Sequence, residues 1–200
     1  MSHHRHSSLG FTIIEVTISM ALALLVSITA YTLFSTLFNQ YFGLQEDGSE
    51  FTNLASQSQR MANVIRGATD IISESSTDLS VYAYFSPNDT YVSQVHYYLN
   101  ANSTTLYADV TPMTANPPIG TPITDQKKTY TIIDDYHPLA GLSLFAYLDA
   151  SGAQMSLPIA DENAIKEIQI NLAVPADHPS SGGNQQMSLQ VSLRNRKTNL

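Results

Sequence analysis

The 200-residue chain contains no cysteine and no tryptophan. Without cysteine it has no disulfide framework, no thiolate metal site and no cysteine nucleophile. Positive charge is also scarce, because 9 Lys and Arg residues stand against 17 Asp and Glu residues, a formal net charge of −8. Nucleic-acid binding needs clustered cations, so this balance argues against a nucleic-acid surface. The basic group Arg194, Arg196 and Lys197 is interpreted as a solvated tail.

Charge and proline are missing from a long N-terminal stretch. Residues Val16 to Phe38 include no charged residue, no Pro and no Gly, and no proline occurs before Pro87. As a helix this stretch would extend about 34 Å, enough to cross a hydrocarbon layer of about 30 Å. It is too long for the apolar region of a secretory signal. Its polar residues are Ser and Thr, whose hydroxyls can bond back to the preceding turn or to a neighbouring helix. A single membrane-spanning helix is therefore expected.

Flanking charges predict how this segment is oriented. Arg5 precedes it, whereas Glu46, Asp47 and Glu50 follow it. Basic residues favour the cytoplasmic side of a membrane, so the N-terminus is predicted inside and the remainder outside. Three histidines also lie in the short leader, where no fixed geometry favours a metal site: His3, His4 and His6.

Apolar residues continue at helical spacing beyond the membrane segment. They fall three, four or seven positions apart and form the stripe of an amphipathic helix: Leu44, Phe51, Leu54, Met61, Ile65, Ala68 and Ile72. Gly43 and Gly48 each cost about 1 kcal/mol relative to alanine, which weakens a helix without forbidding it. One nearly continuous helix is predicted from about Phe11 to Ile72, with its amphipathic half in residues 43–76.

After residue 76 the hydrophobic period changes to the alternation of β-strands. Strands are predicted at 79–85, 91–99, 104–110, 129–133, 142–149, 153–157, 165–174 and 186–193. The segments 111–128, with four prolines, and 175–185 are predicted to be surface loops. The predicted fold class is α+β, a long N-terminal helix packed on a small antiparallel β-sheet head in residues 77–200.

The head offers little catalytic chemistry. No nucleophile elbow, phosphate loop, zinc-protease motif or dinucleotide fingerprint occurs. The densest titratable cluster contains Asp134, Asp135 and His137, which would suit a cation or an acid–base pair. However, adjacent side chains on an extended segment point to opposite faces, and the composition is that of a turn. His96 is interpreted as a residue on a sheet face. No enzyme, metal site or cofactor is predicted.

Residues 10–16, Gly-Phe-Thr-Ile-Ile-Glu-Val, join the polar leader to the uncharged segment. This arrangement resembles the processing site of type IV prepilins and pseudopilins. The resemblance implies that a membrane peptidase cuts after Gly10 and methylates the new N-terminus at Phe11. Residues 1–10 would then be a leader peptide, and residues 11–42 the transmembrane and assembly half of the helix. It also implies that Glu15 is needed for subunit assembly.

Elementary chemistry is compatible with these roles. Glycine lets the backbone lie close to a protease, and cleavage after Gly10 would create a cationic amine on Phe11, one helical turn from Glu15. A carboxylate at the edge of a membrane segment needs a partner. In the family that partner is the Phe11 amine of a neighbouring subunit. The alternative is that Glu15 only extends towards the lipid headgroups.

Parts of the head resemble the larger minor subunits, namely the J-type pseudopilin and the W-type minor pilin. The stretches that carry this looser resemblance are 95–99, 105–107, 144–147 with Asp149 and Gly152, 165–172 and 191–195. Two departures from the family stand out. The membrane half lacks the proline of many pilins, so any local loosening would need another site such as Gly43. The missing C-terminal disulfide favours a minor subunit or pseudopilin over the major pilin of a stressed fibre.

The resemblance implies a structural minor pilin or pseudopilin of the bacterial cytoplasmic membrane, later found in a cell-surface or periplasmic filament. Its implied partners are other pilin or pseudopilin subunits, the prepilin peptidase and methylase, an inner-membrane platform protein and an assembly ATPase. One alternative is a pseudopilin of a type II secretion or DNA-uptake system. An alternative from another class is a single-pass membrane-tethered binding domain or ectoenzyme that does not polymerise.

Overall fold

The computed structural model describes residues 12–175 and 184–194, which divide into one unit that ends at Glu46 and another that begins at Asp47. The helix α1 (Ile13–Arg66) contributes its first part to the first unit and its last part to the second. The described residues of the second unit also form eight β-strands in two antiparallel sheets. The predicted α+β fold class, with a long N-terminal helix and antiparallel strands, is confirmed.

The helix α1 ends earlier than its hydrophobic stripe predicts. It stops at Arg66 rather than near Ile72, and β1 (Asp70–Glu74) occupies part of the predicted amphipathic half. Gly67, a poor helix former, follows the last helical residue. The backbone N–H of Thr69 then donates to the carbonyl of Tyr82 at 2.8 Å, which starts the pairing of β1 with β2. The strand pairing satisfies the backbone groups that a longer helix would have used.

The first sheet is a meander of five strands in the order β1-β2-β3-β4-β5. After β1 come β2 (Asp78–Ala83), β3 (Ser93–Leu99), β4 (Leu106–Pro112) and β5 (Lys128–Ile133). The four strands predicted at 79–85, 91–99, 104–110 and 129–133 are confirmed with shifted ends. The proline-rich connection before β5 contains a short 3-10 helix, η1 (Thr124–Gln126), and a single bridge between Met113 and Pro122.

The second sheet has three strands in the order β6-β7-β8. They are β6 (Phe145–Leu148), β7 (Glu167–Val174) and β8 (Gln185–Ser192), with the 3-10 helix η2 (Glu162–Ala164) before β7. The head therefore contains two sheets rather than the single one predicted. The strand predicted at 153–157 is wrong. Only Gln154 forms a bridge there, to Leu148, because Asp149 binds the N–H groups of Ser151 and Ala153 in a turn. The predicted loop 175–185 lies largely outside the described residues.

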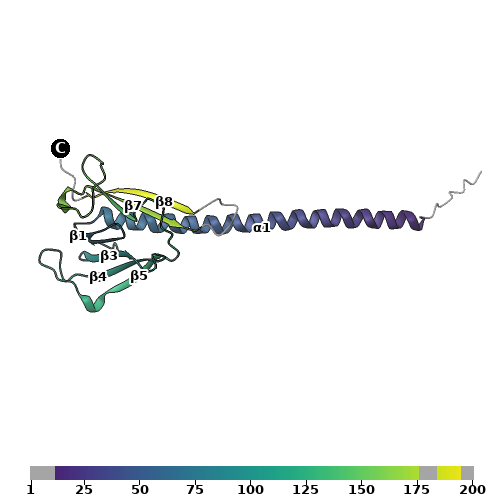
Figure 1. Cartoon of the computed structure of the whole chain (residues 1–200). Helices are drawn as coiled ribbons and strands as arrows, with labels where there is room; N and C mark the ends of the chain where they lie inside the picture. Colours follow the sequence, from purple (N-terminus) through teal and green to yellow (C-terminus); the bar gives the residue numbers. More distant parts are fainter. Residues whose placement is uncertain (1–11, 176–183, 195–200) are drawn as a thin grey trace, which may run out of the picture. The chain divides into compact units, whose positions relative to one another are not determined.

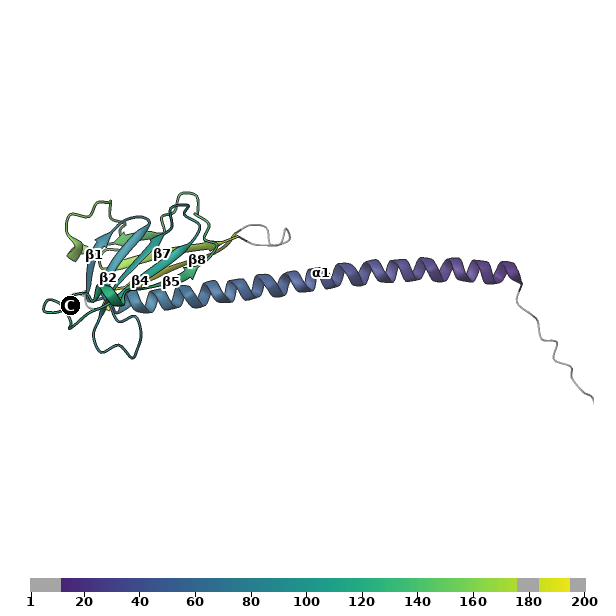
Figure 2. The ribbon, with the colours of Figure 1, turned by 90° about the horizontal axis from the view of Figure 1, so that it is seen from below.

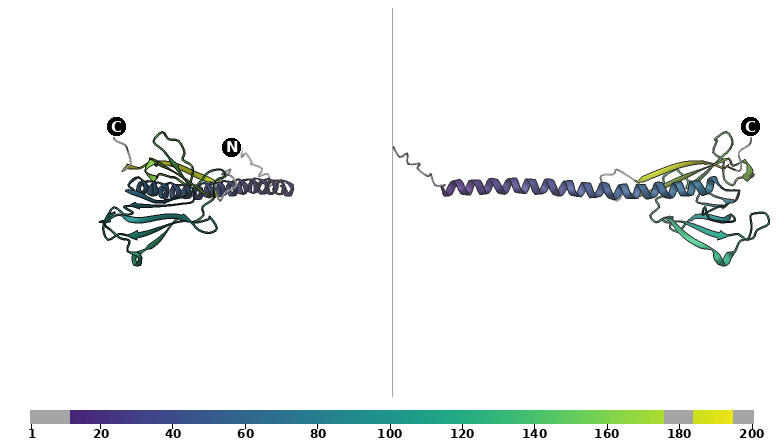
Figure 3. Two further views of the ribbon diagram at one scale, coloured as in Figure 1. Left: turned by 60° about the vertical axis from the view of Figure 1, so that its left-hand side comes forward. Right: turned by 180° about the vertical axis from the view of Figure 1, so that it is seen from behind.

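The core of the second unit forms where α1 meets the two sheets. From the predicted stripe, Leu54, Met61, Ile65 and Ala68 are buried, whereas Phe51 is 46% exposed and the side chain of Leu44 lies outside the described part. Figure 1 shows β7 and β8 above the last part of α1 and the five-stranded sheet below it. In Figure 2, turned by 90°, both sheets lie on the same side of this part of the helix. The two further views in Figure 3 also show the two sheets on different sides of the end of the helix. The last part of α1 therefore covers the junction between the sheets.

Candidate functional site

The first turn of α1 is capped by Thr12. The backbone N–H groups of Glu15 and Val16 donate to the carbonyl of Thr12 at 3.1 and 3.2 Å, and Glu15 N–H also lies 3.3 Å from Thr12 Oγ1. A threonine hydroxyl that accepts from the third helical residue is an N-cap, and Thr-x-x-Glu is the pattern of a capping box. Sequence reasoning missed this role of Thr12, although the spacing of Thr12 and Glu15 was the signal.

Glu15 lies in the first turn of α1, and its side chain is exposed. A negative charge in this position is favourable because the helix N-terminus carries a partial positive charge. Between Thr12 and Gln45 the sequence contains no other charged residue. The remaining predicted processing residues, Gly10 and Phe11, lie outside the described residues, as do the rest of the leader, Arg196 and Lys197.

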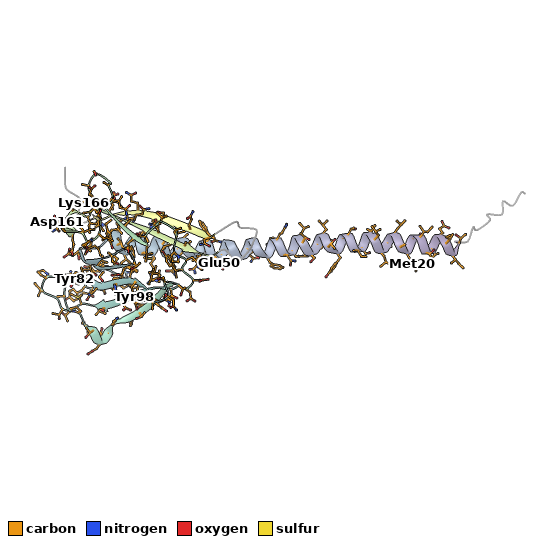
Figure 4. The ribbon with its side chains drawn as sticks, viewed as in Figure 1. Met20, Glu50, Tyr82, Tyr98, Asp161 and Lys166 are labelled. Carbon is orange, nitrogen blue, oxygen red and sulfur yellow. The ribbon has the colours of Figure 1, made fainter. Side chains whose placement is uncertain are left out.

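An apolar surface surrounds the first part of α1. Leu24, Leu25 and Val26 are 64%, 61% and 64% exposed, and successive helical residues point about 100° apart. Figure 4 shows side chains, including that of Met20, projecting outwards along this part of the helix. The helix is long and apolar enough to cross a membrane, and none of its most apolar window is buried. A surface of this kind is suited to contact with lipid or with other apolar helices.

Most serine and threonine hydroxyls within this apolar surface donate hydrogen bonds to carbonyls of the helix itself. Ser19 donates to the Glu15 carbonyl at 2.7 Å, Ser27 to Ala23 at 2.8 Å, and Thr36 to Thr32 at 2.9 Å. The expectation that these hydroxyls bond back to the preceding turn is confirmed. Because these hydroxyls do not depend on water for a hydrogen-bond partner, this part of the segment is chemically suited to an apolar environment.

Aromatic residues gather at the other end of the segment. The rings of Phe38 and Phe42 have centroids 6.3 Å apart, and the rings of Tyr41 and Phe42 lie 6.0 Å apart edge to face. Tyr31 and Phe34 lie on the preceding turns and are 74% and 59% exposed. Tyrosines are enriched where membrane-spanning helices meet the interface with water. The segment from Glu15 to Tyr41 thus has a carboxylate at one end and amphipathic rings at the other.

The titratable cluster at residues 134–137 serves as a connection between the sheets. The backbone N–H of Tyr136 donates to Thr104 at 2.6 Å, and that of His137 donates to Ala173 in β7 at 2.9 Å. His137 Nδ1 and Asp135 Oδ1 are 3.8 Å apart, and both side chains are exposed. Among the described residues, no group of three or more His, Cys, Asp and Glu side chains is arranged to hold a metal ion.

His96 lies on the outer face of the five-stranded sheet, as predicted, beside a polar network around Asp109. Its ring stacks on that of Tyr98 with centroids 4.9 Å apart. Asp109 is its cross-strand neighbour, and the Asp109 carboxylate lies 2.6 Å from Lys127 Nζ and accepts a 2.5 Å hydrogen bond from Thr129. Burial would raise the pKa of the Asp109 carboxyl, but the hydrogen bonds from Lys127 and Thr129 outweigh it and lower the pKa. The network braces β4 against the start of β5.

The exposed carboxylate and apolar surface of α1 are therefore the strongest candidate functional site among the described residues. No family model and no curated protein sequence matches the chain.

Proposed function

We propose that this protein is a prepilin-like structural subunit, a minor pilin or pseudopilin, whose first helix is successively a membrane anchor and an assembly helix. One observation carries the proposal. Apolar side chains surround the segment from Ile13 to Phe42, yet its first turn keeps one exposed carboxylate, Glu15. A plain anchor accounts for the apolar surface, and the helix N-terminus favours a carboxylate in the first turn, but neither gives that carboxylate an ionic partner. Assembly through the helix accounts for both.

In the proposed reactions, a peptidase hydrolyses the bond after Gly10, and the new amine of Phe11 then takes a methyl group from a sulfonium donor, which leaves as a thioether while the amine loses one proton. The methylated amine keeps its positive charge, so it remains an ionic partner for a carboxylate. Glu15 of one subunit then pairs with the Phe11 amine of a neighbour. A carboxylate surrounded by apolar helices is costly unless it is paired and hydrogen-bonded, so the pair would fix the axial register between subunits.

Extraction from the membrane is compatible with the surface of α1. The exposed Leu, Ile, Val and Phe side chains of the segment exchange lipid chains for the equally apolar surfaces of neighbouring helices. The hydroxyls of Ser19, Ser27 and Thr36 can stay bonded to carbonyls of their own helix during this exchange. The proposed topology has the N-terminus in the cytoplasm of a bacterium, one span of the cytoplasmic membrane, and the head outside.

The proposed partners are other pilin or pseudopilin subunits, a prepilin peptidase and methylase, a platform protein in the inner membrane and an assembly ATPase. A role in type II secretion or DNA uptake, rather than in a surface pilus, remains a second form of the same proposal. The net charge of −8 disfavours direct DNA binding by this chain in either role. A tethered binding domain or ectoenzyme would use α1 only as an anchor.

Mass spectrometry of the chain extracted from membranes tests the proposal. The full chain is expressed with a prepilin peptidase, and the expected N-terminal peptide begins with N-methylated Phe11. The matched variant Gly10→Val is expected to stay uncut, because its side chain blocks the close approach of the backbone to the protease. A wild-type chain that keeps its Met1 start beside the active peptidase would refute the proposal and favour the tethered domain.

A further inference from the structure

Two adjoining grooves in the second unit share Phe85 and Ser86 in their walls. The first has a volume of about 690 Å³ and is lined by parts of β3, β4 and β5 and by the loop that contains Tyr91. The second has a volume of about 660 Å³ and lies between Tyr84 and the stretch of α1 around Arg60 and Asn63. Because they share these two residues, the two grooves adjoin each other at Phe85 and Ser86, and together they are called the groove below.

The groove occupies an uncovered end of the core-facing side of the five-stranded sheet. In β5, Lys128 pairs with Val110 and Tyr130 pairs with the buried Ala108, so these side chains share one face. Further along β5, Ile132 and Ile133 are buried, whereas Lys128 and Tyr130 are exposed. The core therefore covers this sheet face at the end near Ile132 and leaves it open at the end near Lys128 and Tyr130.

The walls of the groove are fixed by contacts within the protein. The rings of Phe85 and Tyr130 have centroids 5.0 Å apart, and the guanidinium of Arg60 lies 4.7 Å from the Phe85 ring centroid. The Asp89 carboxylate accepts a 2.9 Å hydrogen bond from Ser86 N–H. These contacts exist without a ligand, so binding would require little ordering of the walls.

The exposed lining combines aromatic rings with neutral hydrogen-bonding groups. Tyr84, Tyr91 and Tyr130 are 44%, 44% and 36% exposed, and the amides of Gln59, Asn63 and Gln126 lie among them. The cations Arg60 and Lys128 are balanced by the carboxylates of Asp89 and Asp125. A lining without net charge gives no long-range attraction to a polyanion or a polycation.

We propose that this groove binds an uncharged oligosaccharide. The C–H face of a sugar ring packs on an aromatic ring, and its hydroxyl groups exchange hydrogen bonds with amides and tyrosine hydroxyls. An extended peptide would add to the free edge of β5, whereas the lining of the groove consists of side chains on the core-facing side of the sheet, so a peptide is the comparison ligand in the test. The inference concerns the head alone and does not depend on cleavage or polymerisation.

Saturation-transfer NMR and calorimetry on the full chain test this inference. The chain is held in a zwitterionic detergent, since sugar-headed detergents would compete for the groove. The probes are a hexamer of β-1,4-linked N-acetylglucosamine, a hexamer of β-1,4-linked glucose, and a twelve-residue peptide of alternating Ser and Val as the comparison ligand. Binding of at least one sugar is expected, with signal transfer strongest at the C–H groups of its rings.

Substitutions at Tyr91 locate the site. Tyr91→Ala is expected to weaken sugar binding about 5-fold through loss of the ring contact, whereas Tyr91→Phe should keep it within about 2-fold. Tyr107→Ala, on the opposite face of the sheet, is the matched control and should leave affinity unchanged. Thermal unfolding of each variant checks its fold. Absence of binding to both sugars, equal affinity in Tyr91→Ala and wild type, or binding of the peptide alone would overturn the inference.

Discussion

The hydroxyl of Tyr147 in β6 donates a 2.9 Å hydrogen bond to the carbonyl of Ser75, which lies in the turn between β1 and β2. The same hydroxyl accepts a 3.2 Å hydrogen bond from the Ser75 N–H. Burial raises the pKa of Tyr147 well above its usual value, so the group stays a neutral donor. Phe145 N–H donates to Ser76 beside it at 3.1 Å. These bonds join the two sheets at one point.

Removal of this hydroxyl should loosen the junction between the sheets. Tyr147→Phe keeps the buried ring but leaves the Ser75 carbonyl without this donor, whereas Ser75 N–H keeps its 2.9 Å bond to the Asp78 carbonyl, so the free energy of unfolding should fall by about 1 kcal/mol. Urea unfolding of the full chain in micelles, followed by tyrosine circular dichroism, measures the change. Tyr107→Phe is the control, because the Tyr107 hydroxyl makes no hydrogen bond among the described residues. Equal losses in both variants would contradict the role of the Tyr147 hydroxyl.

The Asp109 network should make the head sensitive to acid. The pKa of Asp109 is lowered in the folded state, so its contribution to stability is present above the pKa of the unfolded carboxyl, about 3.9, and is lost as the pH falls through the lower folded value. Thermal unfolding between about pH 6 and pH 2 should therefore show a smaller acid-induced decrease for Asp109→Asn than for wild type.

A second variant separates the Asp109 pair from general acid effects. Lys127→Met removes the ammonium that lies 2.6 Å from the carboxylate. The pKa of Asp109 should then rise, and its contribution to stability should disappear at a higher pH. Lys166→Met, directly before β7, is the control for loss of one positive charge. If the two lysine variants lose stability over the same pH range, the ion pair has no specific effect.

The uncharged stretch and the local periodicity were sufficient to predict a long N-terminal helix and most strands, but not where the helix ends. Ala68 and Ile72 fit the helical stripe, yet Ile71 and the residues around it also suit a strand. Pairing with β2 decides the outcome, because Asp70 and Ile71 lie opposite Tyr82 and Val81. Such pairing is tertiary information that a spacing rule along α1 does not contain.

The division into two sheets and the polar networks also depend on contacts between distant residues. Tyr147 and Ser75 are 72 positions apart, and Thr129 is 20 positions from Asp109. The groove likewise combines residues of α1 with residues of β5. Glu15 differs from these features, because what makes it unusual is its position next to an uncharged segment in the same stretch of sequence. A single carboxylate beside an uncharged segment is visible in the sequence without any knowledge of the fold.

The N-cap at Thr12 offers a test of how the first turn of α1 is held. Thr12→Val removes the hydroxyl that accepts from Glu15 N–H and should weaken the helix start by about 1 kcal/mol. Hydrogen exchange in micelles should then be about 5-fold faster at the Glu15 amide. Thr12→Ser restores a capping hydroxyl and is expected to restore protection. Unchanged exchange in Thr12→Val would show that the hydroxyl is not the determining cap.

Substitutions at Glu15 test its proposed role in assembly separately from processing. Glu15→Ala should leave the cut after Gly10 intact but reduce incorporation into filaments at least about 10-fold, because the neighbouring Phe11 amine would be left unpaired among apolar helices. Glu15→Gln keeps size and hydrogen bonding without charge and should give a similar loss if the ionic attraction matters. Ser19→Ala is the matched control, since its hydroxyl only bonds back to the Glu15 carbonyl. Quantitative mass spectrometry of sheared or extracted filaments gives the subunit content and the N-terminus in one measurement. Normal incorporation of Glu15→Ala would contradict the proposed role of the carboxylate in assembly and would favour a contact with lipid headgroups instead.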